Sequence, residues 1–225
     1  MSAQHRKAKE QLMQQDISSK KYAPVGCVLM ASGEAKRFGS NKLLADFRGQ
    51  PMLCRALAAA NTPLVAVRIV VTRSEAVAEL CRAQGADVLC HSLPARSDTV
   101  RLGLSSLLAQ QPELAGCIFM PCDQPLLRRE SVEALVQGFF AQNKTERAIC
   151  RLGYRAENDP TPIVGSPVLF GSAYFDALCH LPEGKGGSVI LRHHPECVHN
   201  VYTPYREELM DADTPEALRQ LEAML

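Results

Sequence analysis

A run of small and cationic residues gives segment 28–42 (VLMASGEAKRFGSNK) the composition of a phosphate-binding loop. Residues 31–33 are short, so their backbone N–H groups can approach an anion closely, and the glycine among them can adopt positive φ without steric cost. Arg37 can hold phosphate oxygens through two parallel hydrogen bonds, whereas Lys42 carries a compact charge that can follow a phosphate into the transition state. The segment therefore predicts binding of a polyphosphate.

The same segment differs from the two common nucleotide-binding motifs. It lacks the GKS or GKT ending of a P-loop, and it lacks the three spaced glycines of a dinucleotide site. A dehydrogenase would also place an acidic residue at the end of the second strand, where this chain has Thr72, Arg73 and Ser74. Kinase, ATPase and dehydrogenase functions are therefore disfavoured.

Two acidic positions are candidates for binding a divalent cation. Asp123 follows an apolar run within residues 117–125 (CIFMPCDQP), and Asp211 lies in a later segment, residues 209–216 (LMDADTPE). Mg²⁺ binds one or two carboxylates together with phosphate oxygens and water, so a pair of acids at the end of a strand and in a loop suits it. Asp123 and Asp211 are the predicted metal ligands.

The neighbouring Asp213 has a structural alternative. Pro215 suits the first turn of a helix, so either Asp213 or Thr214 is expected to be the N-cap of that helix. Asp211 has no comparable structural role.

A third polar segment, residues 93–104 (LPARSDTVRLGL), precedes and enters a predicted helix. Arg96 can bind a phosphate or a pyrimidine carbonyl, and the hydroxyl groups of Ser97 and Thr99 can bond to backbone or base. An N-cap role for Ser97 or Asp98 is equally consistent with the sequence.

The elements that must position these residues alternate along the chain. Short apolar runs indicate buried parallel strands at 25–30, 67–72, 87–90, 117–121 and 148–152, and amphipathic stretches indicate helices at 52–60, 75–84, 98–110 and 131–142. This alternation predicts an α/β fold, a three-layer α/β/α sandwich with a mostly parallel, Rossmann-like sheet. Ligands of such folds bind at the carboxyl ends of the strands, where the loops described above begin.

Composition limits the partners and the location. The 25 Lys and Arg against 24 Asp and Glu give a net charge of +1, so no long-range field favours nucleic acid or a membrane as partner. Nine cysteines, without zinc-site spacing and without an apolar leader, predict a reduced, cytoplasmic protein. Residues 1–22 contain few large apolar side chains and are expected to form a flexible tail, whereas residues 23–225 are expected to form a single domain. Monomer or weak homo-oligomer is the expected state.

The first loop resembles the LxAGxGxRxGxxK signature of the MobA-like NTP transferases, which activate sugars, isoprenoid precursors and the molybdenum cofactor. The positions that carry the resemblance are Leu29, Ala31, Gly33, Arg37, Gly39 and Lys42. The chain departs from the pattern in residues 32–35 (SGEA), where the family more often has Ala-Gly-x-Gly or Ala-Gly-x-Ser, so Ala35 replaces a residue with more backbone freedom or a hydroxyl. The resemblance extends over residues 25–221 and includes the CDQP and DTPE segments.

This resemblance implies roles for the residues singled out above. It implies a Mg²⁺-dependent transfer of a nucleoside monophosphate, with Arg37, Lys42 and Asp123 as catalytic residues and with Asp123 and Asp211 on the metal. Residues 93–104 resemble the RxxSVxxGL element of cytidylyltransferases, which favours CTP. The implied nucleotide-binding residues are Leu29, Ala31, Ser32, Gly33, Lys42, Arg96, Ser97 and Thr99.

The acceptor is expected to bind near residues 165–170 (GSPVLF), which resemble the GHPVLF segment of molybdenum cofactor cytidylyltransferases and related accessory proteins of molybdenum hydroxylases. Gly165, Ser166 and Pro167 are the implied acceptor-binding residues, with Ser166 in place of the usual histidine. Residues 183–188 (EGKGGS) stand where that group has a GDxG-like loop, and the aspartate is missing.

The resemblance thus implies transfer of CMP from CTP to a phosphate-bearing acceptor, with molybdopterin as the favoured acceptor and a molybdenum hydroxylase as a possible partner. Two alternatives stay open. One is a nucleotidyltransferase that acts on a sugar phosphate or on methylerythritol phosphate. The other is a non-catalytic protein that carries a nucleotide-containing cofactor to a molybdenum enzyme, which the altered acceptor segments allow.

Overall fold

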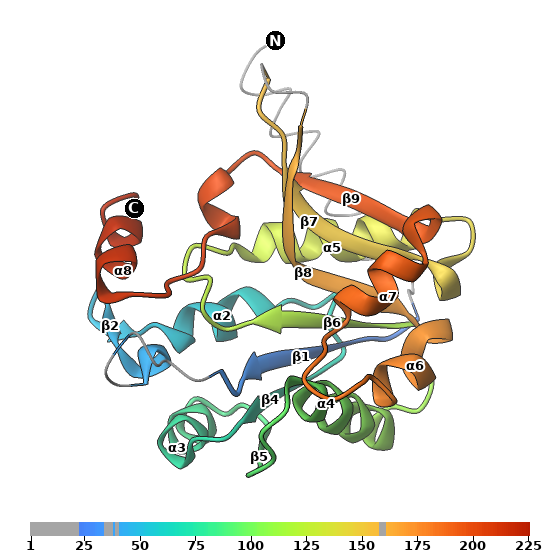
Figure 1. The fold of residues 1–225 in the computed structure, drawn as a ribbon. Coiled ribbons are helices and arrows are strands. Elements are labelled where there is room, and N and C mark those ends of the chain that lie inside the picture. The colour runs from blue at the N-terminus through green and yellow to red at the C-terminus, as the bar shows by residue number, and fades with distance from the viewer. Residues whose placement is uncertain (1–22, 34–37, 39–40, 158–160) are drawn as a thin grey trace.

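The structure is a computed structural model that describes residues 23–33, 38, 41–157 and 161–225 (Figure 1). Within these residues, seven strands form one central sheet in the order β5-β4-β1-β6-β8-β7-β9. The strands are β1 (Val25–Ala31), β4 (Val67–Thr72), β5 (Val88–Cys90), β6 (Gly116–Pro121), β7 (Ile149–Tyr154), β8 (Ile163–Gly171) and β9 (Val198–Thr203). A separate two-stranded ribbon pairs β2 (Asp46–Phe47) with β3 (Gln50–Pro51).

The sheet is parallel except at one strand. All neighbouring pairs run parallel apart from β6 with β8 and β8 with β7. The mostly parallel α/β fold predicted from the sequence is confirmed. The antiparallel β8 was not predicted, because its apolar run is interrupted by glycine and proline and its partners lie in separate parts of the chain.

Helices cover both faces of the sheet (Figure 1). None of those in the described residues has the length and apolar character needed to cross a membrane. The α-helices are α2 (Leu53–Ala60), α3 (Glu75–Ala83), α4 (Arg96–Gln110), α5 (Arg129–Phe140), α6 (Phe175–Cys179), α7 (Ser188–His193) and α8 (Pro215–Glu222). Short 3₁₀ helices are η1 (Lys42–Leu44), η2 (Thr145–Arg147), η3 (Ser172–Tyr174), η4 (Pro195–Cys197) and η5 (Arg206–Leu209).

Alternation along the strands divides the core between the two faces. In β1, Cys27 and Leu29 join the cluster that α2, α3 and α5 cover, whereas Val28 joins the cluster under α4, α6 and α7. Successive side chains of a strand point to opposite faces, so each buried strand supplies both layers. Because helices cover both faces of the sheet, a ligand is expected to bind at the loops that follow the strand ends.

The observed elements begin close to the predicted positions. The helix expected from residue 98 begins at Arg96, and the helix expected from residue 131 begins at Arg129. The predicted tail, residues 1–22, lies outside the described residues. Each shift places an arginine in the first turn of its helix, which matters for Arg96 because it lies at the carboxyl edge of the sheet.

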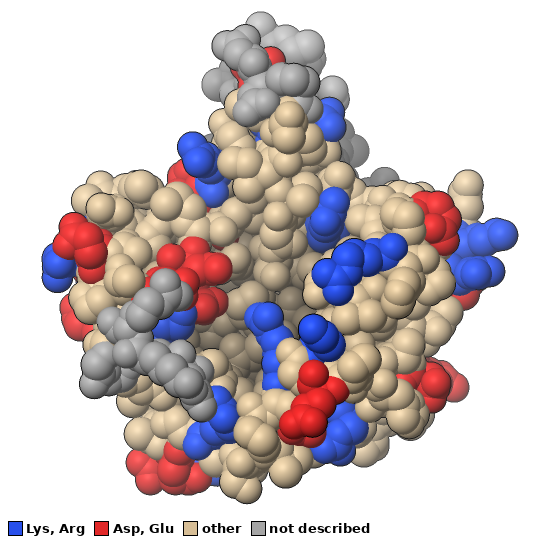
Figure 2. Space-filling view, in the orientation of Figure 1, with Lys and Arg blue, Asp and Glu red and all other residues tan. Residues whose placement is uncertain are grey.

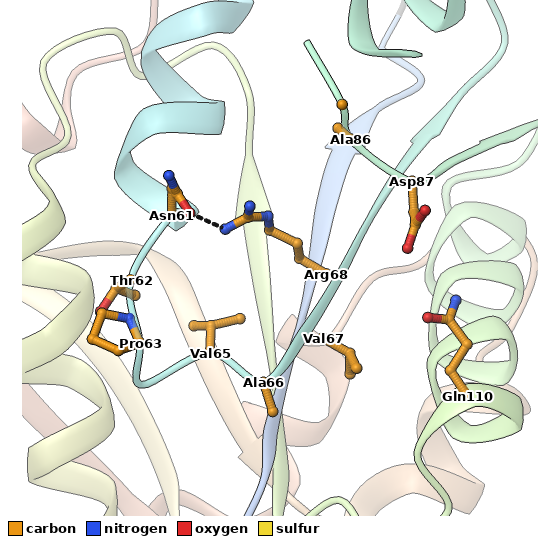
Figure 3. Close-up of a pocket in the computed structure, with 11 residues that line it drawn as sticks. Asn61, Thr62, Pro63, Val65, Ala66, Val67, Arg68, Ala86, Asp87 and Gln110 are labelled. Carbon is orange, nitrogen blue, oxygen red and sulfur yellow. Dashed lines mark hydrogen bonds between the residues drawn. The ribbon is translucent and has the colours of Figure 1, made fainter. Parts of the chain in front are cut away.

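A polar cavity of about 400 Å³ lies at the amino end of β4 (Figure 3). There, a terminal nitrogen of Arg68 donates to the Asn61 side-chain oxygen at 2.7 Å and approaches the Ala60 carbonyl at 3.4 Å. Asn61 ends α2, so the arginine supplies hydrogen bonds and positive charge to the exposed carbonyls of that helix. This arrangement closes a helix, and it provides a reference for the cavity at the opposite end of the sheet.

Candidate active site

The larger candidate cavity, about 660 Å³, lies at the carboxyl ends of β1, β4 and β6. Its walls combine loops that follow these strands with the start of α4 and part of β8. Figure 2 shows this face hollowed near its centre, with Lys and Arg side chains gathered around the hollow. The polar lining residues are Ser32, Arg73, Arg96, Thr99, Asp123, Gln124, Ser166 and Asp211.

Lys42 links two acidic residues that are distant in sequence. Its Nζ donates to Oδ2 of Asp123 at 2.7 Å and to Oδ1 of Asp213 at 2.9 Å. Lys42 begins η1, and Asn41 fixes this turn by accepting a hydrogen bond from the Leu43 N–H. Burial opposes the charged form of Lys42, but the hydrogen bonds and charges of the two carboxylates raise its pKa above the ordinary value. The lysine is therefore held as a cation.

Asp211 lies beside this ion-pair group. Gln124 donates from Nε2 to Oδ1 of Asp211 at 3.0 Å. Desolvation and the nearby charge of Asp123 raise the pKa of Asp211 above its ordinary value, although the residue stays exposed at the edge of the cavity. The Gln124 Oε1 atom is buried and has no hydrogen-bond partner among the described residues. The acids thus form a crowded, anionic edge of the cavity.

The N-cap of α8 is Thr214, which resolves the alternative left open for Asp213. The Thr214 hydroxyl accepts from the Ala217 N–H at 3.1 Å, whereas Asp213 accepts from Lys42. Sequence reasoning did not assign Asp213 to the site, because a DTP segment before a helix is typical of capping and the partner lysine is 171 residues away.

The phosphate-loop residues are divided between core and cavity. Ser32 and Gly33 line the cavity, while Leu29 and Ala31 are buried in β1. Leu29 is wholly enclosed in the core, so its side chain cannot contact a nucleotide in this arrangement. Arg37, a predicted catalytic residue, lies outside the described residues.

Two residues that the sequence did not single out hold the loop. The Ser32 carbonyl accepts from Nε of Arg73 at 3.0 Å and from Nη2 at 2.9 Å. The Ser32 hydroxyl donates to the Val71 carbonyl and lies 3.2 Å from Nε2 of His91. These residues follow β4, which pairs with β1, and β5, which is the next strand beyond β4, an order that the sequence alone does not reveal.

The predicted nucleotide-binding residues of α4 also differ in position. Arg96 and Thr99 line the cavity, but the Ser97 hydroxyl accepts from the Gly184 N–H at 3.3 Å and is not part of the lining. Asp98 makes the capping contact, accepting from the Ala95 N–H at 3.2 Å. Ser97 therefore connects the start of α4 to the 183–188 loop.

A second cavity of about 260 Å³ adjoins the first. Arg96, Gly165 and Ser166 belong to both linings, whereas Pro167 belongs to neither. Its other walls are mainly apolar and include Phe119 and Phe170, whose rings meet edge to face with centroids 5.9 Å apart. The remaining lining residues include Val100, Arg151, Val168, Gly186, Gly187, Ser188 and Leu191.

The solved structures that resemble this chain share its fold. A synthetase of CMP and 2-keto-3-deoxy-manno-octonic acid, solved with CTP, matches 90% of this chain and 98% of its own at 16% identity and TM-score 0.71. The manganese complex of Rv0371c from Mycobacterium tuberculosis H37Rv matches 91% of this chain and all of its own at 23% identity and TM-score 0.66.

Sequence comparison identifies the family. A 3-deoxy-manno-octulosonate cytidylyltransferase from Chlorobium phaeobacteroides is 30% identical over 104 residues, which are 45% of this chain and 40% of that protein. The alignment thus spans less than half of that relative. The family model of the MobA-like NTP transferase domain matches residues 27–198, which are most of the chain. This range includes every cavity wall described above except the segment of Asp211. The resemblance seen in the sequence is confirmed, and the chain belongs to the MobA-like NTP transferase family.

Proposed function

We propose that this protein is a divalent-metal-dependent nucleotidyltransferase that transfers CMP from CTP to a phosphate-bearing acceptor and releases pyrophosphate. The observation that carries the proposal is the position of Lys42, which follows the phosphate-loop segment and lies between Asp123 and Asp213. A lysine held this way can exchange a carboxylate partner for a phosphate oxygen when a nucleotide and its metal enter.

The donor atoms available at the acidic edge fit Mg²⁺. Asp123 and Asp211 would hold the cation, with Asp213 as a third carboxylate nearby, and such oxygen ligands are those that Mg²⁺ prefers. When bound, the metal would neutralise charge on the triphosphate and orient it. In the described part of the chain, no group of three or more His, Cys, Asp or Glu side chains could hold a metal by itself.

The reaction requires little proton transfer from the protein. An ionised oxygen of the acceptor phosphate would attack the α-phosphorus of CTP in line, and the bond from this phosphorus to the α,β-bridging oxygen would break. The electron pair of the broken bond leaves with the pyrophosphate. The residues' task is to position the reactants and stabilise the growing charge, for which Lys42 is placed and Arg37 is expected.

Two considerations favour CTP. The sequence relative is a cytidylyltransferase, and one structural neighbour is a CMP synthetase solved with CTP. In this chain, Arg96 lines the cavity at the start of α4, where the cytidylyltransferase-like element lies. Thr99, also on α4, adds a hydroxyl to the same wall.

The acceptor proposed from the sequence is molybdopterin, with a molybdenum hydroxylase as the eventual recipient. The second cavity supports this choice over a sugar or polyol phosphate, because its aromatic and aliphatic walls suit a flat ring better than hydroxyl groups. Arg151 could meet the charge of such an acceptor; its Nε donates to Oδ1 of Asn200 at 2.7 Å, which orients the guanidinium.

The test measures pyrophosphate release from CTP, GTP and ATP with Mg²⁺, each with molybdopterin, with methylerythritol 4-phosphate and without acceptor. Asp123→Asn and Lys42→Met are compared with wild type. Asp87→Asn, at the amino-end cavity, and the exposed Lys144→Met are the matched controls.

We expect release with CTP and molybdopterin only, lost in both site variants and kept in both controls. Release with methylerythritol phosphate instead would select the alternative transferase. Tight CTP binding without turnover of any acceptor would favour the carrier protein, and no nucleotide binding at all would refute the proposal.

A further inference from the structure

The backbone of Ser32 is fixed by side chains that the proposed mechanism does not use. Arg73 donates two hydrogen bonds to the Ser32 carbonyl, at 3.0 and 2.9 Å. The Ser32 hydroxyl donates to the Val71 carbonyl at 3.0 Å and lies 3.2 Å from Nε2 of His91. Contacts from β4 and from the residue after β5 thus converge on the single residue that follows β1.

The arginine fork sets the direction of the next N–H group. A trans peptide is planar, so the carbonyl of Ser32 and the N–H of Gly33 point in opposite directions. Two hydrogen bonds that converge from a rigid guanidinium on this one oxygen restrain the direction of the carbonyl and thus the orientation of its peptide plane. The Gly33 N–H is therefore expected to point away from the Arg73 guanidinium, and Gly33 lines the same cavity as Arg73 and Asp123.

The hydroxyl contact requires one tautomer of His91. Because the Ser32 hydroxyl hydrogen goes to the Val71 carbonyl, its oxygen accepts from His91, which places the hydrogen on Nε2. The Nδ1 atom of His91 is then a buried acceptor, and it has no partner among the described residues. Within the described residues, the hydrogen bond of His91 Nε2 with Ser32 is therefore the one that the ring nitrogens make.

We infer that Arg73 and His91 are positioning residues that lock the Ser32–Gly33 peptide, so that the Gly33 N–H donates to a phosphate oxygen of the bound nucleotide. The inference rests on the proposed function for its ligand. It also gives a role to Ser32, where the family more often has alanine. An alanine has no hydroxyl group, so it could not make the contacts with Val71 and His91.

The competing explanation is that Arg73 attracts phosphate directly by its charge. Arg73→Lys separates the two, because lysine keeps the charge but cannot form the planar fork. His91→Gln and His91→Leu make a second pair, since only the glutamine amide can replace the N–H of Nε2. Arg82→Lys, an exposed arginine on α3, is the matched control.

The experiment measures the Kd of Mg²⁺–CTP by titration calorimetry and the melting temperature of each variant. We expect Kd to rise about 10-fold or more in both Arg73→Lys and Arg73→Gln, as the loss of charge-assisted hydrogen bonds predicts. His91→Leu should raise Kd about 3- to 10-fold and His91→Gln less than His91→Leu, with the KM of the acceptor unchanged. Wild-type affinity in Arg73→Lys, or in His91→Leu, would overturn the inference.

Amide hydrogen exchange of nucleotide-free protein distinguishes this inference from the function on which it rests. If Arg73 and His91 order the peptide, we expect faster exchange at residues 31–33 in Arg73→Lys and His91→Leu. Exchange there should be unchanged in Arg82→Lys. Unchanged exchange would refute the lock even if CTP is turned over. If the wild-type protein binds no nucleotide, the proposed function is wrong, and so is the role of Gly33 as a hydrogen-bond donor to phosphate. The exchange result would still test whether Arg73 and His91 order the Ser32–Gly33 peptide.

Discussion

The two ends of the central sheet both carry polar cavities, but their charged groups are assembled differently. At the amino end, Arg68 bonds Asn61, seven residues earlier, and the pair closes a helix. At the carboxyl end, Lys42 joins Asp123 and Asp213, 81 and 171 residues later. A contact of the first kind needs only local structure. The second needs the whole fold, which indicates that a polar cavity becomes a candidate for chemistry when distant segments bring opposing charges to it.

The largest effect should follow from removing charge at the carboxyl end. Asp123→Asn keeps the shape of the side chain but removes a charge from both Lys42 and the proposed metal, so we expect kcat for pyrophosphate release to fall by about 10²-fold or more. Asp87→Asn, in the amino-end cavity, should change kcat less than about twofold. Equal losses in both variants would remove the distinction between the two ends.

Asp211→Asn is expected to have two smaller effects of opposite sign: it should stabilise the metal-free protein and weaken metal binding. Desolvation and the charge of Asp123 raise the pKa of Asp211, so the unfolded chain loses this proton first as the pH rises. Stability from this group is present at low pH and is lost as the pH rises through the folded pKa. At pH 7 in EDTA, Asp211→Asn should therefore melt on the order of 1–2 °C higher than wild type, allowing for solvent screening.

The same variant should bind metal more weakly. Removing one of two carboxylates is expected to raise the apparent Kd for Mg²⁺ in the presence of CTP by about 10-fold. Melting scans at pH 4 and pH 7 and a Mg²⁺ titration check both halves, and Glu113→Gln serves as a control in the loop after α4. A lower melting temperature at pH 7 would mean that Asp211 stabilises the metal-free fold.

Arg68→Met should affect stability alone. The substitution keeps most of the aliphatic stem but removes the hydrogen bonds to the end of α2, so we expect a loss of about 1 kcal/mol in the free energy of unfolding. Denaturant unfolding measures this loss, and kcat should stay within about twofold of wild type. A marked fall in kcat at constant stability would give the amino-end cavity a functional role.

The smallest effect concerns His91 and pH. Burial and the charge of Arg73 lower the pKa of His91, so the unfolded chain binds the proton more readily. The contribution of the neutral ring is complete above the ordinary pKa of about 6.5 and is lost as the pH falls. The difference in melting temperature between wild type and His91→Gln should shrink by on the order of 1 °C between pH 7.5 and pH 5.5. A difference independent of pH would contradict this.

Local patterns were sufficient to predict much of the fold and the main loops. The runs that became β1, β4 and β6 are apolar and continuous, and Asp123 stands at a strand end by its position in the sequence alone. The antiparallel β8 was missed because strand direction depends on pairing, which the sequence of one segment does not carry.

The candidate site was predictable to the same extent. Ser32, Gly33 and Arg96, which stay predicted nucleotide-binding residues, line the cavity, but the side chain of Leu29 lies in the core and Ser97 contacts a loop. The roles of Arg73 and Asp213 depend on contacts between remote segments, so residue type and spacing gave no signal for them. The choice of candidate residues followed from local sequence, whereas the contacts that hold them depend on tertiary structure.

The central claim is transfer of a nucleoside monophosphate at the carboxyl end of the sheet. Its most direct test follows CTP labelled at the α-phosphate, incubated with Mg²⁺ and molybdopterin. The account predicts that the label moves into a product containing both CMP and the acceptor, with equal release of pyrophosphate and no movement in Asp123→Asn. Label that stays in CTP, or that appears only as free CMP whether or not acceptor is present, would contradict it.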